Sequence, residues 1–369
     1  MDDTAIKHRA HHEPWIRIVR RPDLSGGQVA LLSGLAVLLG LILGGLFILA
    51  LGHNPLAVYA AIFKGAFRSK LAFQGTVKIA IPLLITSLGV LLAFKMKFWN
   101  IGAEGQIIMG GVFATYFGVF HGDWPQWILL PVMLLAGLIG GGLWGLIPAF
   151  FKTKFGTNET LFTLMLNYIA LYLILYLRDG PWRDPNSTAY PQIAMFSDNA
   201  RLGKVAGIQI GWIIALVLVV LAFVYVRYTK HGYEIAVVGE SQNTARYAGM
   251  NVKKIVMRTM FLSGGIAGIA GMIQCSGTTY TLTDGIAGGV GFTAIIVAWL
   301  ARLNPFVAVI ITALLSILEK GCSVMQSTFG LSTYVSDILQ GIILFTVLAI
   351  DFFTRYGLVF RKKKEAKNA

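Results

Sequence analysis

Long uncharged runs of apolar residues constrain this chain more than any other feature of its sequence. Residues 28–51, QVALLSGLAVLLGLILGGLFILAL, contain no charged side chain, and as an α-helix they would extend about 36 Å. About 20 apolar residues are enough for a helix to cross the roughly 30 Å hydrocarbon core of a bilayer. Because lipid offers the backbone no hydrogen bonds, such runs cross membranes as helices.

Ten predominantly apolar runs with few charged residues follow one another along the chain. Hydrophobic residues make up 56% of its 369 residues and charged residues 13%, against roughly 25% charged in soluble domains. The sequence therefore predicts an all-α polytopic membrane protein of about ten transmembrane helices, with a cytoplasmic arm over 1–27, a transmembrane domain over 28–355 and a basic tail over 356–369. The expected spans are 28–51, 76–94, 104–120, 127–150, 158–177, 211–228, 257–275, 286–301, 305–321 and 333–353.

The distribution of Lys and Arg predicts which side each loop faces. If the N-terminus is cytoplasmic and the spans alternate, 22 of the 31 Lys and Arg residues fall on the inner side, as the positive-inside rule requires. The net charge of +14 thus indicates membrane topology and not nucleic-acid binding. Both termini are expected in the cytoplasm, with the tail RKKK (361–364) against anionic membrane lipids.

Two polar, glycine-rich stretches interrupt the apolar runs. FWNIGAEGQ (98–106) and DGIAGGVGFTAI (284–295) lie five spans apart, so alternating topology brings them in from opposite sides, as in an inverted repeat with broken helices. Glu104 suits a helix N-terminus, where the helix dipole favours negative charge. It could equally line a solute path, because ionisable residues within membranes usually face a cavity.

Five further residues are candidates for the solute pathway, each with a structural alternative. Asn100 and Gln106 either satisfy backbone groups at the break or line the path, and Asn167 either bonds between helices or contacts a polar solute. Phe292, which shares a helix face with Trp299, either packs in the core or stacks on a planar ring. Gln340 either joins Asp337 in pairing with Lys320 or contacts the solute.

One inner loop, YTKHGYEIAVVGESQNTARYAGMNVKKIV (228–256), carries the signals of a short helix. Ser241 is a plausible N-cap, residues 242–248 make about two turns, and Gly249 can adopt the left-handed C′ position. Arg246 and Tyr247 would project from this helix. It either lies on its own membrane domain or inserts into a cytoplasmic partner, and its polar face favours the partner.

Motifs for covalent or nucleotide chemistry are absent from the sequence. It contains no G-x-x-x-x-G-K-[ST] phosphate-binding loop, no HExxH and no GxSxG. The chain is therefore not expected to be an enzyme, and either an ion gradient or another polypeptide must supply energy for any transport.

Five motifs, in order, resemble those of a known family: NIGAEGQIIMGG (100–111), NETLFTLMLNYIALYL (158–173), ARYAGMNVKK (245–254), GFTAIIVAWLARLNP (291–305) and SDILQGIILFTVLAIDFF (336–353). The chain resembles the permease subunit of ATP-binding-cassette (ABC) importers of the ribose and branched-chain amino acid permease superfamily. Within it, the likeness is strongest to the nucleoside branch, which is served by a lipoprotein receptor of the basic-membrane-protein type. The stretch VGFTAIIVAWLA (290–301) departs from the YGFDAIAVALLG-like family pattern at Thr293 and Trp299.

The resemblance implies a bacterial plasma-membrane complex for import of a nucleoside or a related small polar solute. Its partners would be ABC ATPase subunits, a second homologous permease chain (a heterodimer in this branch) and an extracytoplasmic solute-binding lipoprotein. No cofactor is expected on this chain, because ATP and Mg would be used by the ATPase. By the same resemblance, residues 239–250 form the coupling helix, with Gly239, Glu240, Arg246, Tyr247 and Gly249 at the ATPase contact.

Three rival interpretations remain on the sequence alone. A simple-sugar ABC permease differs only in its solute. An ion-coupled secondary transporter would need paired acidic residues at mid-membrane, and this chain has few. A membrane scaffold without transport does not account for the broken helices.

Overall fold

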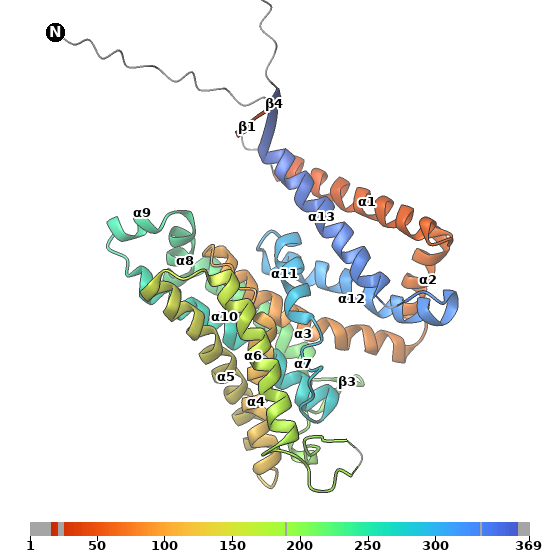
Figure 1. The fold of residues 1–369 in the computed structure, drawn as a ribbon, viewed down its shortest axis with the longest axis vertical. Coiled ribbons are helices and arrows are strands. Elements are labelled where there is room, and N and C mark those ends of the chain that lie inside the picture. The colour runs from red at the N-terminus through yellow and green to blue at the C-terminus, as the bar shows by residue number, and fades with distance from the viewer. Residues whose placement is uncertain (1–15, 21–25, 189, 333, 361–369) are drawn as a thin grey trace, which may run out of the picture. The chain divides into compact units, whose positions relative to one another are not determined.

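Helices account for most of the computed structural model, which describes residues 16–20, 26–188, 190–332 and 334–360 (Figure 1). The chain divides into two units. Met1–Val58 and Tyr334–Ala369 form one, here called the terminal unit, and Tyr59–Thr333 form the other, the central unit.

The terminal unit brings the two ends of the chain together. Helices α1 (Gly26–Ala50) and α13 (Val335–Arg355) approach so closely that a Cβ at Gly40 would lie 3.0 Å from the Cα of Ile343. Strands β1 (Ile16–Arg20) and β4 (Tyr356–Phe360) pair antiparallel. The all-α prediction did not include this strand pair, which joins part of the predicted arm to part of the predicted tail.

The central unit begins at Tyr59, within α2. Several of its helices start where the sequence places a capping side chain: Asn158 Oδ1 accepts from Thr160 N at 3.0 Å, and Asn304 Oδ1 accepts from Phe306 N at 3.0 Å, as expected of N-caps. The elements are α2 (Pro55–Phe67), α3 (Lys70–Lys95), α4 (Ala103–Phe120), α5 (Gln126–Phe155), α6 (Glu159–Asp179), η1 (Asp198–Ala200), β2 (Lys204–Val205), β3 (Ile208–Gln209), α7 (Gly211–Tyr228), α8 (Lys230–Glu240), α9 (Gln242–Tyr247), α10 (Val252–Gln274), η2 (Cys275–Thr279), α11 (Val290–Leu300) and α12 (Pro305–Phe329).

Six helices of the described residues are long and apolar enough to cross a membrane: α3, α5, α6, α7, α10 extended by η2, and α12. A seventh is counted if the bent pair Gly34–Ala50 and Pro55–Phe67 is one span. The predicted span 286–301 contains only the 11-residue α11, about 16 Å long, because the glycines before Val290 stay outside the helix. The structure therefore supports six or seven full spans by length and composition, fewer than the ten predicted.

Glycines form the contact surfaces of α4, α5 and α10. A Cβ at Gly268 of α10 would lie 2.1 Å from the carbonyl oxygen of Gly137 on α5, and one at Gly110 of α4 would lie 2.2 Å from the Cα of Gly268. Gly141 and Gly264 approach each other as closely. Small residues at such spacing let helix backbones pack directly, as in membrane helix pairs, so these three helices form the centre of the unit.

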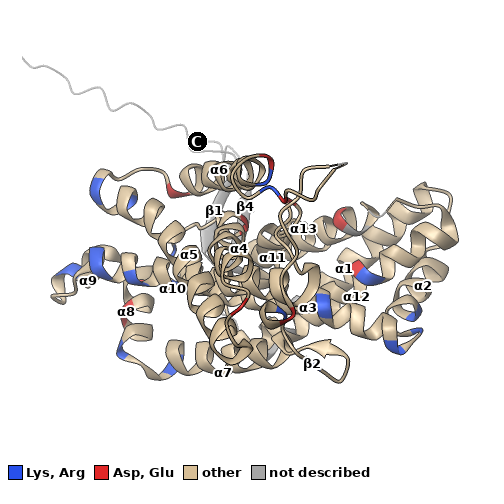
Figure 2. Cartoon of the chain, turned by 90° about the horizontal axis from the view of Figure 1, so that it is seen from below, with Lys and Arg blue, Asp and Glu red and all other residues tan. Residues whose placement is uncertain are grey.

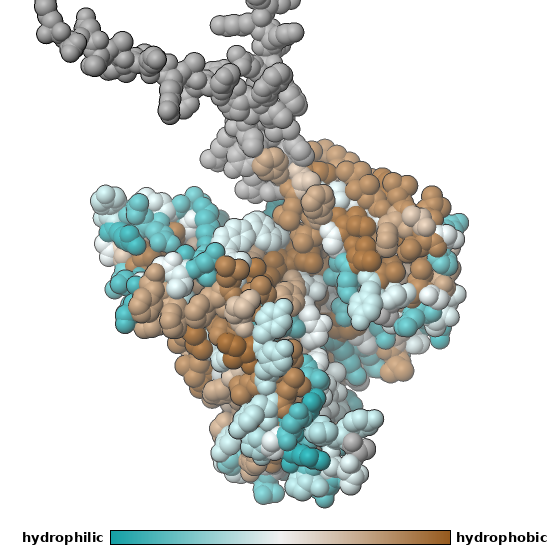
Figure 3. All heavy atoms as spheres, in the orientation of Figure 1, coloured by the Kyte–Doolittle hydropathy of each residue, from teal (hydrophilic) through white to brown (hydrophobic). Residues whose placement is uncertain are grey.

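Polar loops gather at the two ends of the α4, α5, α6 and α10 bundle, with an apolar band between them (Figure 3). One end carries α8 and α9. At the other, the segment after α6 folds over its neighbours: Ser197 Oγ donates to Gly122 O at 3.0 Å, and Leu202 N donates to Ser276 O at 3.0 Å. The segment 178–210, described except for residue 189, thus packs against the helices at this end.

Candidate functional site

The chain between α3 and α4 is not helical, and side chains satisfy its backbone. Lys97 adopts a left-handed conformation with φ +57°. Asn100 Oδ1 accepts from Gly102 N at 3.0 Å, and Thr163 Oγ1 accepts from Ile101 N at 3.2 Å. A broken helix is tolerated at membrane depth only where other groups satisfy the freed backbone, and here α6 supplies one of them.

Glu104 joins the N-termini of two helices. Its Oε1 accepts from Gly289 N and its Oε2 from Gly291 N, both at 2.7 Å. Gly289 is the left-handed residue before α11, while Glu104 itself lies in the first turn of α4. The carboxylate therefore lies where both helix dipoles favour negative charge. We call Glu104, Gly289 and Gly291 the α4–α11 junction.

The junction depends on the absence of a side chain at residue 291. A Cβ there would lie 2.2 Å from the backbone N of Glu104 and 2.6 Å from its Cα. Both are backbone atoms, so the two helices would have to separate to accept any side chain. The two glycine-rich stretches found in the sequence thus contact each other directly.

A buried amide network supports the start of α4. Asn100 is fully buried and Gln106 is 1% exposed. Asn100 Nδ2 donates to Gln106 Oε1 at 3.1 Å and to Ser263 Oγ at 3.4 Å, and Ser263 Oγ donates to Gly89 O at 2.7 Å. The network links α3, α4 and α10 and satisfies the polar groups that the sequence places at this depth.

Asn167, on α6, also satisfies backbone groups at the break before α4. Its Oδ1 accepts from Gly105 N at 2.9 Å, and its Nδ2 donates to Ile101 O at 2.9 Å. These are the interhelical hydrogen bonds that the sequence offered as one alternative. A role for Asn100, Glu104, Gln106 or Asn167 in the solute pathway stays a prediction.

The aromatic candidates on α11 differ in their surroundings. Phe292 is 44% exposed and follows the junction glycine directly. Trp299 stacks on Trp99 with ring centroids 5.6 Å apart and lies 5.8 Å from the ring of Phe94. Trp299 thus packs against the end of α3 and the segment that follows it, whereas Phe292 leaves a ring face accessible.

Gln340 is the one pathway candidate that lies outside the central unit. It is buried on α13, 4% exposed, and belongs to the terminal unit. Asn100, Glu104, Gln106, Asn167 and Phe292 all belong to the central unit.

The predicted short helix of the 228–256 loop is α9. Ser241 Oγ accepts from Thr244 N at 3.2 Å, and Gly249 adopts φ +74°, so both predicted end signals are confirmed. Tyr247 is 93% exposed and projects from the helix as predicted. Six residues make a helix that is marginal by itself, so its caps and the buried Ala245 hold it in place.

Helix α8 fixes the position of α9. A Cβ at Gly239 would lie 2.2 Å from the carbonyl oxygen of Lys95, so α8 contacts the end of α3 backbone to backbone. Arg258 Nη2 donates to Glu234 Oε2 at 2.8 Å, which ties α8 to α10 and holds the pKa of the Glu234 carboxyl below its ordinary value. Glu240, at the end of α8, is exposed.

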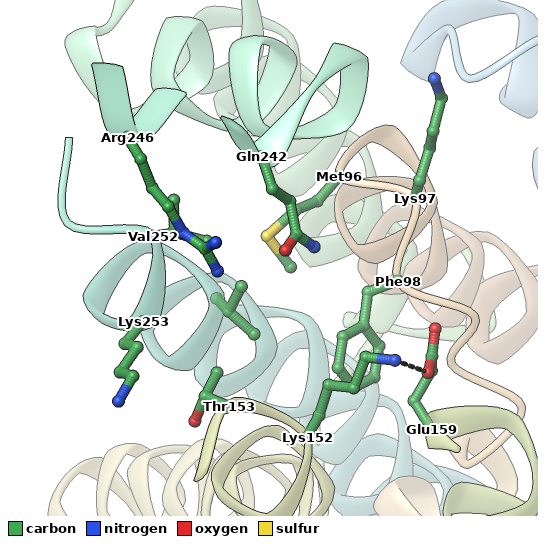
Figure 4. A pocket seen from close by; sticks show the side chains of 11 residues that line it. Met96, Lys97, Phe98, Lys152, Thr153, Glu159, Gln242, Arg246, Val252 and Lys253 are labelled. Atoms are coloured by element: carbon green, nitrogen blue, oxygen red, sulfur yellow. Dashed lines mark ion pairs between the residues drawn. The ribbon is translucent and has the colours of Figure 1, made fainter. Parts of the chain in front are cut away.

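A groove of about 100 Å³ opens beside α9 (Figure 4). Arg246 and Gln242 point into it, Lys152 pairs with Glu159 across it at 2.7 Å, and Lys97 and Lys253 stand at its rim. Lys230 of α8, Arg246 of α9 and Lys253 and Lys254 of α10 are among the blue segments at this end of the unit in Figure 2. We call this feature the α9 groove; its lining residues are Met96, Lys97, Phe98, Lys152, Thr153, Glu159, Gln242, Arg246, Val252, Lys253 and Val256.

Sequence reasoning missed the partners of these residues. Gly289 and Gly291 had a visible signal, since GGVG (288–291) precedes an apolar helix. Lys97 follows α3 and Lys152 lies near the end of α5. Both are far from Arg246 in the sequence, and nothing local indicates that they line one groove with it.

Three known proteins that this chain resembles belong to one class, the permeases of ABC transporters. Residues 71–348 match the family described as "Branched-chain amino acid transport system / permease component". The chain is 33% identical over 343 residues to the guanosine ABC transporter permease protein NupP of Bacillus subtilis, covering 90% of this chain and 96% of that protein.

Two further relatives extend the match. The chain is 30% identical over 344 residues to the glucose ABC transporter permease protein TsgB13 of Haloferax volcanii, with 89% and 90% of the two chains covered. It is 28% identical over 347 residues to the nucleoside ABC transporter permease protein NupB of Lactococcus lactis subsp. cremoris, with 91% and 94% covered. This chain belongs to the family of branched-chain amino acid transport system permease components and is a multi-pass membrane subunit of an ABC transporter, not an enzyme.

Proposed function

We propose that this chain is the transmembrane permease subunit of an ATP-driven importer for nucleosides or a related small polar solute. The observation that carries the proposal is the match to guanosine and nucleoside permeases along about nine-tenths of the chain. The polar, glycine-broken centre of the described bundle supports it, because broken helices in transporters bind solutes near mid-membrane.

The membrane domain of this proposal comprises ten helices: the six long ones together with α1, α4, α11 and α13. Helices α4 and α11 are the two broken members, and the glycines before each belong to corresponding places of an inverted repeat. The meeting of their N-termini at Glu104 supports this arrangement, since half-helices of inverted repeats end at a shared site.

In this proposal the end of the central unit that carries α8 and α9 is cytoplasmic, as are both termini. The excess of Lys and Arg in the loops at that end supports the orientation. Residues 239–250 couple to the ATPase. Gly239 and Gly249 set the backbone shape of this segment, and Glu240, Arg246 and Tyr247 contact the ATPase. A second, different permease chain forms a heterodimer with this one, as in the nucleoside branch. An outer solute-binding lipoprotein completes the complex, and membrane lipids surround it.

The chain itself makes and breaks no covalent bonds. The partner ATPase binds and hydrolyses ATP with Mg. The resulting movement of α9 changes which face of the membrane the cavity opens to. Asn100, Glu104, Gln106, Asn167, Phe292 and Gln340 are the residues that we propose along the path. Binding there is expected to be weak, with selectivity left to the outer receptor.

Uptake in proteoliposomes tests the proposal. The purified complex of this chain, its ATPase and its second permease is reconstituted with its receptor protein, and ATP-dependent uptake of radiolabelled guanosine is measured. Saturable uptake that requires ATP is the expected result. Absence of uptake for purine and pyrimidine nucleosides alike, in a complex that hydrolyses ATP, would contradict the nucleoside assignment.

A sugar is the second candidate solute, because the relative from Haloferax volcanii is a glucose permease at 30% identity. Competition separates the two. Excess glucose should leave guanosine uptake unchanged, while excess inosine should suppress it. The ion-coupled alternative predicts that a protonophore abolishes uptake at constant ATP.

A further inference from the structure

The α9 groove has an imbalance of charge that the chain itself does not neutralise. Four cations, Lys97, Lys152, Arg246 and Lys253, line it against a single carboxylate, Glu159. That carboxylate is paired to Lys152 at 2.7 Å. Among the residues that the structure describes, no acidic side chain pairs with the other three cations.

Arg246 occupies a special place among them. The sequence predicted that it would project from α9 beside Tyr247, but its guanidinium points back into the groove, into which the amide of Gln242 also points (Figure 4). A guanidinium offers a planar pair of donors that matches a carboxylate in a bidentate arrangement. The amide of Gln242 adds a further donor on the same side.

The dimensions and walls of the groove restrict what can enter. A volume of about 100 Å³ is enough for one acidic side chain. Met96, Phe98, Val252 and Val256 form apolar walls against which the methylene groups of such a side chain can pack.

We propose that the α9 groove receives an Asp or Glu side chain from the partner ATPase, bound by Arg246 and Gln242 and attracted by Lys97 and Lys253. This inference rests on the proposed function, because it takes the ATPase as the occupant. The contact is reciprocal: Tyr247 enters the surface of the ATPase while the ATPase inserts an acid behind α9.

The groove also reaches the segment that precedes the broken helix. Its walls include Lys97 and Phe98, which lie three and two residues before Asn100, and Glu159 at the start of α6. An acidic side chain held there contacts α9, α10, the start of α6 and the non-helical segment that leads from α3 to α4. One inserted side chain thus connects the ATPase to four segments of the permease.

Charge reversal in the whole complex tests the proposal. Arg246→Glu is expected to weaken retention of the ATPase in a detergent pull-down at least about tenfold, and Gln242→Ala severalfold. Lys253→Glu should weaken it less than Arg246→Glu, and the effect should shrink with rising salt. The matched control is Lys254→Glu, an exposed neighbour outside the groove, which should change retention less than twofold. Gel filtration of each variant checks that the permease is folded.

Rescue identifies the occupant. In the Arg246→Glu background, exposed Asp and Glu residues of the ATPase are replaced by Arg one at a time, and restoration by one position is expected. If Arg246→Glu and Lys254→Glu retain the ATPase equally, the inference is overturned while the proposed function stands. A defect that no ATPase position rescues, but that depends on anionic lipid in the vesicles, assigns the groove to a headgroup and also overturns it. Failure of the wild-type chain to retain any ATPase counts against the proposed function itself.

Discussion

At the α4–α11 junction each carboxylate oxygen of Glu104 accepts a backbone N–H at 2.7 Å, and the amides around it bond to one another. In the α9 groove, three cations have no acidic partner among the described residues, and the guanidinium of Arg246 points into open space. Both regions concentrate polar side chains beside short helices. They differ in whether the chain satisfies those side chains by itself.

That difference separates what the fold needs from what a partner needs. Buried polar groups without partners cost stability, so a self-satisfied junction indicates a contact that the fold depends on. Unpaired charges at an accessible groove cost little, because water solvates them, and they remain available for another chain. The four predictions below run from the largest expected effect on fold stability to the smallest.

Glu104→Ala should destabilise the protein most, by about 3 kcal/mol, since it leaves two part-buried backbone N–H groups without a charged acceptor. Two quantities are measured: the thermal unfolding midpoint in detergent and the uptake per folded molecule. Glu240→Ala, an exposed glutamate on α8, is the matched control and should unfold like the wild type. A Glu104→Ala protein of normal stability that fails only in uptake would favour a solute-pathway role over the capping role.

Gly291→Ala should cost about 1–3 kcal/mol by overpacking, because its Cβ would lie 2.2 Å from the backbone of Glu104. Gly285→Ala is the control: no atom lies within 4 Å of a Cβ built there. Equal unfolding midpoints for the two variants would show that α4 and α11 do not approach as the structure places them.

The Glu234–Arg258 pair should give a small pH dependence. Arg258 holds the pKa of the Glu234 carboxyl below its ordinary value, so the pair stabilises the fold above the usual glutamate range of about 4.3. This contribution is lost as the pH falls through the lowered pKa. Glu234→Gln should therefore be less stable than the wild type near pH 7, by under about 1 kcal/mol, and the gap should close below about pH 4. Parallel stability curves from pH 7 to 3.5 would contradict this.

Arg246→Ala should leave fold stability within about 0.5 kcal/mol of the wild type, since the guanidinium has no acidic partner within the described chain. ATP-driven uptake should nevertheless fall sharply. Paired measurements of unfolding midpoint and uptake check this, with Lys254→Ala as control. A large loss of stability would mean that Arg246 serves the fold, and the contrast between groove and junction would disappear.

Local signals in the sequence account for much of the molecule. Ser241 and Gly249 mark the ends of α9 because a cap and a left-handed turn involve residues only a few positions apart. Asn158 marks the start of α6 for the same reason. The apolar runs that define the long helices are also local, and the motifs that indicated the permease family are short contiguous stretches.

Tertiary structure alone decided which distant residues meet. The partners of Glu104 lie 185 and 187 positions further along the chain, and no local pattern pairs them with this carboxylate. The α9 groove combines Arg246 with residues after α3, at the end of α5 and at the start of α10. Periodicity and capping report on neighbours within one or two turns of a helix, whereas close glycine packing and charge placement depend on how the helices assemble.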